Sequence, residues 1–143
     1  MKMRVVTNTN KGKLLVLADR MAKAAGSSYA VDVIPPAYPK ERERLVIIVA
    51  SLSKSMPSSF NIFCNDMNRD RTANVALVVD GTPDKNAEAI SAVKENVTRA
   101  GARFFDEVLY ISGGLPFKFA KKTTPQDETA VDEWLSRVLV SLA

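Results

Sequence analysis

The sequence predicts a single α/β domain built on a doubly wound, five-stranded parallel sheet in the order 2-1-3-4-5, with helices on both faces. Three observations support this prediction. Short strand-like segments alternate along the chain with segments that have the period of amphipathic helices. The segments 45–50 and 74–80 are almost continuously apolar, which is typical of strands covered on both faces. The length of 143 residues suits one domain, residues 1–143.

The first half of the chain is expected to supply three strands, at 4–6, 29–34 and 45–50. A helix should begin near Leu14 and end at Gly26, because glycine is the commonest residue just beyond a helix end. Its apolar face consists of Leu14, Leu17, Ala18, Met21, Ala22 and Ala25.

Prolines and charges interrupt the pattern after the second strand. Residues 35–44 contain three prolines and then alternating charges, which indicates a lost or shortened helix. The loop 51–59 follows the third strand. Beyond it, Phe60, Phe63, Cys64 and Met67 lie on one face of the next predicted helix.

The second half continues with a strand at 74–80 and a helix that starts with Thr82 as N-cap and Pro83 as its first residue. Gly101 should end this helix, and its inward side chains are Ile90, Val93, Val97 and Ala100. A fifth strand is expected within 103–112, centred on 107–111.

The last predicted helix begins with Thr124 as N-cap and Pro125 as its first residue, with acidic residues in its first turn. Its buried stripe should consist of Val131, Trp134, Leu135, Val138 and Leu142.

Composition excludes several classes of chemistry. The chain has no histidine, so no catalytic triad or histidine-ligated metal is available, and we predict no metal site. Its single cysteine, Cys64, excludes an intramolecular disulfide and favours a cytoplasmic location, and we read it as a core residue. No segment approaches the length of a membrane span, and the N-terminus does not resemble a secretory signal. The net charge is +4.

In an open parallel sheet, ligands bind beyond the carboxyl ends of the strands. This rule selects the loops 7–13, 51–59, 80–83 and 112–123.

The loop after the first strand has the chemistry of an anion site. Thr7, Thr9 and Asn10 offer hydroxyl and amide groups, and Gly12 allows close backbone approach. Lys11 and Lys13 add positive charge at the start of a helix, where free N–H groups attract phosphate. The alternative is a turn that only caps the helix through Thr9 or Asn10.

The stretch Thr7-Asn8-Thr9-Asn10-Lys11-Gly12 resembles the phosphate loop of the flavodoxin-like family, which reads roughly Ser/Thr-x-Thr-Gly-x-Thr. Thr7 and Thr9 keep two hydroxyl positions, whereas Asn10 replaces the glycine and Gly12 replaces the last threonine. In element order the resemblance covers nearly the whole chain. It implies a flavodoxin-like fold and non-covalently bound FMN, with the phosphate held by Thr7, Thr9, Asn10, Lys11, Gly12 and Lys13.

The same resemblance implies where the flavin ring would lie. The residues that would flank the ring are Ser51, Leu52, Ser53, Met56, Gly81 and Thr82. The loop after the third strand lacks the aromatic residue that often contacts the ring in flavodoxins. Alternatively, Leu52 and Met56 cover the following helix, and Thr82 is a plain N-cap.

Three other features resemble the short menaquinone-dependent protoporphyrinogen oxidase branch of this family. They are the turn 56–60, the stretch Gly113–Phe117 followed by lysines, and Trp134. The chain lacks the longer basic insertion expected before the last helix of that branch, so its substrate is not carried over.

The leading hypothesis is a flavodoxin-like protein that uses FMN for electron transfer or as a small FMN-dependent oxidoreductase. No side chain needs a catalytic role, because the flavin supplies the chemistry. The alternative is an FMN-free binding or regulatory module. The partner would be a redox protein or a small-molecule acceptor, nucleic acid is not expected, and the chain would be a monomer or homodimer. Flavodoxins are typically acidic, so the net charge of +4 argues against the usual partner surface.

Overall fold

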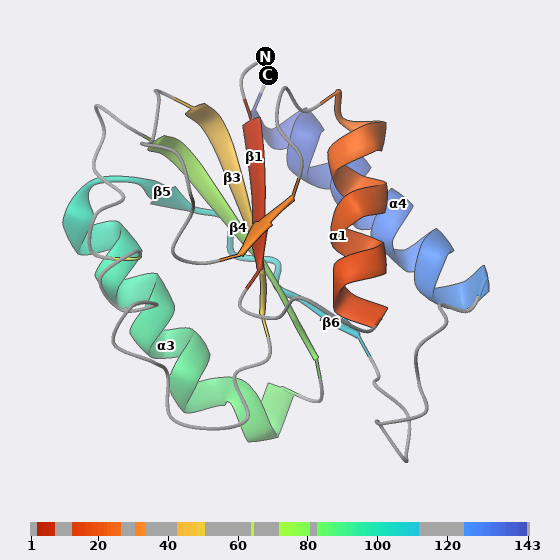
Figure 1. Ribbon diagram of the computed structural model, residues 1–143. Coiled ribbons are helices and arrows are strands. Elements are labelled where there is room, and N and C mark those ends of the chain that lie inside the picture. Colours follow the sequence, from red (N-terminus) through yellow and green to blue (C-terminus); the bar gives the residue numbers. More distant parts are fainter. Residues whose placement is uncertain are drawn as a thin grey trace.

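The molecule is a parallel sheet between two helical layers, shown as a computed structural model in Figure 1. The structure describes residues 3–7, 13–26, 31–33, 43–50, 64, 72–80, 83–111 and 125–142. Among these residues the strands are β1 (Met3–Thr7), β2 (Asp32–Val33), β3 (Glu43–Ala50), β4 (Thr72–Asp80), β5 (Arg103–Phe104) and β6 (Leu109–Ile111). The helices are α1 (Lys13–Ala24), α3 (Pro83–Ala100) and α4 (Pro125–Ser141).

The sheet has the predicted order. Its neighbours run β2-β1-β3-β4-β5, β6 also pairs with β4, and every described pairing is parallel. β3 and β4 each begin two residues before their predicted starts, at Glu43 and Thr72. The part of the predicted second strand that the structure assigns to β2 is Asp32–Val33.

The apolar strands divide between two cores because successive side chains point to opposite faces of a sheet. In β3, Leu45, Ile47 and Val49 belong to the core under α1 and α4. Their neighbours Val46, Ile48 and Ala50 belong to the core under α3. All six are almost completely buried, which confirms that this strand is covered on both faces.

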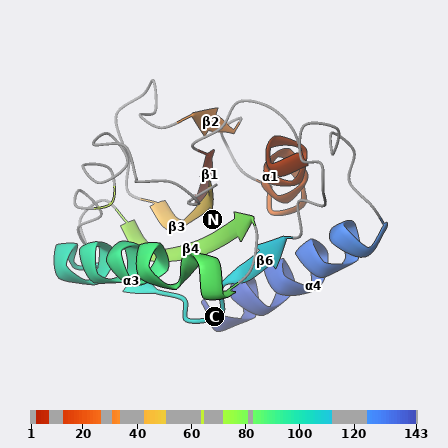
Figure 2. The same ribbon diagram turned by 90° about the horizontal axis from the view of Figure 1, so that it is seen from below.

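The helices pack as expected from their apolar stripes. Figure 2 shows α1 and α4 on one side of the sheet and α3 on the other. In α4, the side chains of Val131, Trp134, Leu135 and Val138 are buried as predicted, and Leu142 is partly buried against the same core. Cys64 is helical and buried on the α3 side, as expected for a core residue.

Two glycines end helices as predicted. Gly26 follows α1 with a φ of 68°, and Gly101 follows α3 with a φ of 116°. The Gly26 N–H donates to the carbonyl of Lys23, which closes the last turn of α1. The other predicted helix residues Phe60, Phe63, Met67, Thr82 and Thr124 lie outside the described residues.

The fifth strand lies within 103–111 as predicted, but it is not the single strand centred on 107–111 that the sequence indicates. It is divided into two short strands, β5 and β6, which both pair with β4. The N–H of Phe105 still donates to the Val75 carbonyl of β4 at 2.8 Å, and the strand is interrupted from there to Val108. A continuous strand in the register of β5 would place Asp106 and Glu107 beside Leu77 and Val78, which are fully buried. Burying carboxylates in the packed layers is costly, and the break keeps both at the surface.

Candidate functional site

The carboxyl ends of four strands meet at one edge of the sheet, the edge seen from below in Figure 2. β1 ends at Thr7, β3 at Ala50, β4 at Asp80 and β6 at Ile111. The strand register holds these ends nearly level: Thr7 pairs with Val49, Ala50 with Val79, and Asp80 with Ile111. With strands about 4.8 Å apart and a rise of about 3.3 Å per residue, Thr7 and Asp80 stand roughly 12 Å from each other, because Asp80 lies two residues beyond the level of Thr7.

Helix α1 starts at the same edge and has the electrostatics of an anion site. It begins at Lys13, only six positions after Thr7 in the sequence, and its first turn contains no acidic residue. By contrast, the first turn of α4 carries Asp127 and Glu128. Carboxylates in a first turn neutralise the free N–H groups and the dipole there. Among the described residues, no carboxylate in the first turn of α1 offsets the positive end of the helix, and such an end favours an anion.

Thr7 is the predicted site residue whose side chain the structure describes. It is completely buried and shares the α1-facing side of β1 with Met3 and Val5. Lys13 is placed as the first residue of α1. Thr9, Asn10, Lys11, Gly12, Ser51, Leu52, Ser53, Met56, Gly81 and Thr82 lie outside the described residues.

Asp80, the last residue of β4, is an acidic residue at the same carboxyl end of the sheet. It is half-buried at the end of β4 and lies opposite Ile111 of β6. Within the part of the chain that the structure describes, no three acidic, cysteine or histidine side chains come together as a metal site would require. In that same part, no helix is long and apolar enough to cross a membrane.

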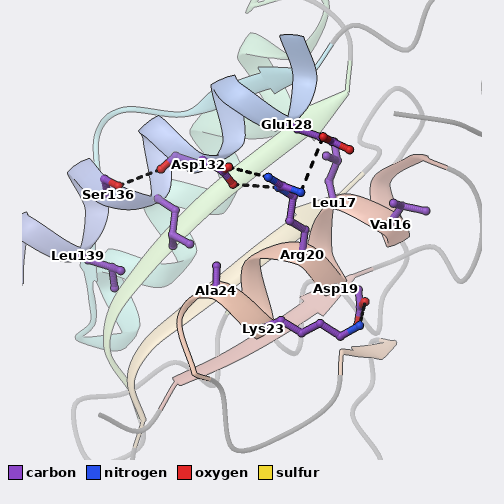
Figure 3. A pocket seen from close by; sticks show the side chains of 11 residues that line it. Val16, Leu17, Asp19, Arg20, Lys23, Ala24, Glu128, Asp132, Ser136 and Leu139 are labelled. Atoms are coloured by element: carbon purple, nitrogen blue, oxygen red, sulfur yellow. Dashed lines mark hydrogen bonds and ion pairs between the residues drawn. The ribbon is translucent and has the colours of Figure 1, made fainter. Parts of the chain in front are cut away.

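A groove of about 600 Å³ lies elsewhere, between α1 and α4 (Figure 3). Arg20 of α1 spans it and donates two hydrogen bonds to the carboxylate of Asp132, at 3.0 and 2.7 Å. Its guanidinium also lies 3.8 Å from Glu128. These side chains are separated by more than a hundred residues, and no local sequence signal identified them. The groove runs along the helical layer, whereas the strand ends form a different edge of the molecule.

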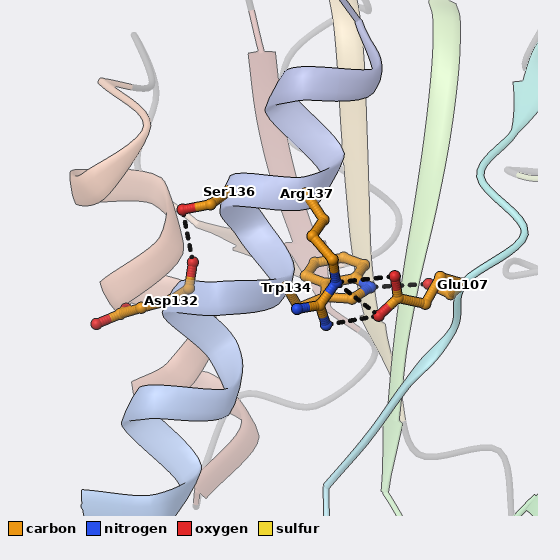
Figure 4. Close-up of polar contacts among 5 residues, drawn as sticks. All are labelled: Glu107, Asp132, Trp134, Ser136 and Arg137. Carbon is orange, nitrogen blue, oxygen red and sulfur yellow. Dashed lines mark hydrogen bonds and ion pairs between the residues drawn. The ribbon is translucent and has the colours of Figure 1, made fainter.

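A second charged contact joins α4 to Glu107, which lies between β5 and β6 on the lateral side of the sheet (Figure 4). Arg137 donates to both carboxylate oxygens of Glu107, with contacts of 2.6 to 3.0 Å. The hydrogen bonds from Arg137 lower the pKa of Glu107, and those from Arg20 lower the pKa of Asp132. Both carboxylates therefore stay ionised further into the acid range than free side chains would.

These lowered pKa values predict an acid-dependent loss of stability. A carboxylate whose pKa is lower in the folded than in the unfolded state stabilises the fold above its ordinary pKa, and that contribution disappears as the pH falls through the folded value. We expect Glu107→Gln to cause a small loss of stability at neutral pH that vanishes in strong acid. Urea unfolding at several pH values measures the difference, with Glu88→Gln on α3 as a control for surface charge. A loss that persists unchanged in strong acid would show that the ion pair does not stabilise the fold.

No protein-family profile and no curated protein sequence matches the chain. Solved structures do match. A short-chain flavodoxin associated with a non-canonical PDU bacterial microcompartment aligns with a TM-score of 0.71 at 11% identity, over 100% of this chain and 99% of its own. The chain has the flavodoxin fold.

Two further flavodoxins support this assignment. The flavodoxin of Streptococcus pneumoniae TIGR4 aligns at a TM-score of 0.69 and 13% identity, covering 99% of both chains. Oxidised flavodoxin 1 from Bacillus cereus aligns at 0.67 and 15% identity over 100% of both. The flavodoxin-like resemblance and the predicted fold class are thus confirmed. The likeness to the protoporphyrinogen oxidase branch stays a prediction.

Proposed function

We propose that the chain binds FMN non-covalently at the carboxyl edge of its sheet and acts in electron transfer or as a small FMN-dependent oxidoreductase. One observation carries the proposal: the flavodoxin fold spans the whole chain, and its α1 begins beside the end of β1 without a carboxylate in the first turn. The free N–H groups and the dipole at a helix start favour a phosphate monoester. This helix start supports a site for the phosphate of a flavin mononucleotide.

The phosphate would be held by the loop that follows β1, through Thr7, Thr9, Asn10, Lys11, Gly12 and Lys13. The ring would lie between Ser51, Leu52, Ser53 and Met56 on one side and Gly81 and Thr82 on the other. When bound, FMN would supply the redox chemistry. The protein would bind and orient it, and a side-chain acid or base is not required.

The segments after β1 and β6 add a charge argument. They contain Lys11, Lys118, Lys121 and Lys122, and the sequence places no carboxylate in 8–12 or 112–124. Such a distribution favours an anionic ligand. It also favours a redox partner unlike that of an acidic flavodoxin. We further propose a cytoplasmic location and a monomeric or homodimeric state.

A second candidate is an FMN-free binding or regulatory module. The substitutions at Asn10 and Gly12 favour it, because they remove one glycine and one hydroxyl of the usual phosphate loop. The two candidates differ in whether the purified chain takes up FMN.

Titration with FMN tests the proposal. The wild-type protein should quench flavin fluorescence and gain thermal stability. Replacing both Lys11 and Lys13 with Ala should weaken binding about 10-fold or more, because a hydrogen bond to a charged group contributes roughly 1.5–3 kcal/mol. Lys23→Ala, an exposed lysine in the last turn of α1, is the matched control. Unchanged affinity in the double variant would remove these lysines from the site, and no uptake by the wild type would favour the FMN-free module.

A further inference from the structure

The edge strand is offset by two residues between β5 and β6. Val75 of β4 pairs with Phe104, and three residues later Val78 pairs with Leu109. The edge chain therefore advances five residues while β4 advances three. The two extra residues form a bulge at residues 105–108. Because the shift is by an even number of residues, each side chain after the bulge stays on the face of the sheet that it would have in a continuous strand.

Contacts from both helical layers hold this bulge. On the α4 side, the indole N–H of Trp134 donates to the Glu107 carbonyl at 2.7 Å, and Arg137 makes its bidentate pair with the Glu107 carboxylate. On the α3 side, Lys94 lies 2.9 Å from the carboxylate of Asp106. The bulge therefore has a charged anchor on each side of the sheet.

A second register is available to the same sequence. If the chain continued from Phe104 without a bulge, Leu109 would stand beside Asp80, and Ile111 would extend two residues past the sheet edge. Two residues of strand span about 6.6 Å. In this register Asp106 and Glu107 would stand beside the fully buried Leu77 and Val78 and enter the buried layers. The two carboxylates thus select the bulged register.

We propose that Glu107, through its pair with Arg137, is a positioning residue that locks β6 in the bulged register. The lock thereby fixes the position at which the chain leaves β6, at the carboxyl end of the sheet where the ligand would bind. In the locked register Ile111 lies beside Asp80, and Ser112-Gly113-Gly114 follows at once in the sequence. Without the lock, Leu109 would lie beside Asp80 in place of Ile111. The consequence for ligand binding rests on the proposed flavin site, whereas the register itself does not.

Removing both charges should release the lock. The double variant Asp106→Val/Glu107→Leu is expected to replace the NMR contacts between the backbones of Val79 and Tyr110 with contacts between Val79 and Val108. FMN affinity should fall at least about 10-fold in the same variant. Glu88→Leu, an exposed carboxylate on α3, is the control and should keep the wild-type contacts. A folded double variant that retains the contact between Val79 and Tyr110 would overturn the lock.

A charge exchange separates positioning from mere packing. Glu107→Arg alone should disturb the register, and Glu107→Arg with Arg137→Glu should restore the contacts of Val79 with Tyr110. Failure of the exchanged pair to restore them would also refute the lock. If the apolar double variant does not fold, Glu107→Gln provides a milder test: amide hydrogen exchange in Leu109–Ile111 should accelerate about 2- to 5-fold relative to β4. Exchange rates in Leu109–Ile111 that are the same in the variant and the wild type would overturn the proposal.

The readouts keep the two proposals apart. A register that shifts as expected in a protein that takes up no FMN would retain the lock and reject the flavin site. A register that does not shift, in a protein that binds FMN, would reject the lock and retain the flavin site.

Discussion

Replacing Trp134 with Ala is expected to lower the free energy of unfolding by about 3–5 kcal/mol, the usual cost of truncating a buried tryptophan. Trp134 is completely buried and anchors α4 to the sheet. Its indole N–H donates to the Glu107 carbonyl at 2.7 Å, and its ring meets Phe105 edge-on at a centroid distance of 6.3 Å. The truncation removes the packing, the aromatic contact and the hydrogen bond together.

Urea unfolding followed by far-UV circular dichroism measures this loss, because the chain has one tryptophan and the variant loses its fluorescence probe. Trp134→Phe is the matched control. It keeps most of the packing and loses the donor, so it should cost about 1 kcal/mol from the hydrogen bond and somewhat more from the smaller ring. A Trp134→Ala variant within 1 kcal/mol of the wild type would contradict the packing of α4 described here.

The sheet was predictable because burial leaves a direct mark on the sequence. A strand covered on both faces must be apolar throughout, and 45–50 meets that condition without interruption. The helix faces were predictable for a similar reason. Leu17 and Met21 in α1, and Val131, Trp134 and Val138 in α4, recur at helical spacing and are fully buried. Parallel order then followed from the alternation of strands and helices.

The divided edge strand was not predictable from periodicity. The segment 103–111 contains the strand-like apolar run 108–111, and an even shift of two residues leaves its side chains on the same faces as a continuous strand would. Only the neighbours of Asp106 and Glu107 on β4 reveal that a continuous strand would bury two carboxylates. The cations that hold them, Lys94 and Arg137, come from helices on opposite faces and leave no local sequence signal.

The location of the candidate site was predictable from the sequence, whereas its individual contacts were not. The rule for parallel sheets selects the carboxyl edge, and Thr7 and Asp80 lie there. Ligand specificity depends on loop side chains such as Lys11, whose identity is not dictated by packing periodicity. The choice between an FMN protein and an FMN-free module therefore depends on the phosphate interaction.

The second large effect is a preference for FMN over riboflavin. The two ligands share the ring, and riboflavin lacks the phosphate that we assign to the start of α1. That helix start has no carboxylate in its first turn, and the preceding loop carries Lys11. Hydrogen bonds to a charged group contribute roughly 1.5–3 kcal/mol each, so one or two of them correspond to about 100-fold in affinity.

Parallel titrations of the flavin-free protein with FMN and riboflavin, read by quenching of flavin fluorescence, test the central claim most directly. We predict saturable binding of FMN and binding of riboflavin that is weaker by about 100-fold. Equal affinities would contradict a phosphate site at α1, and no quenching by either flavin would contradict a flavin-binding function for this chain.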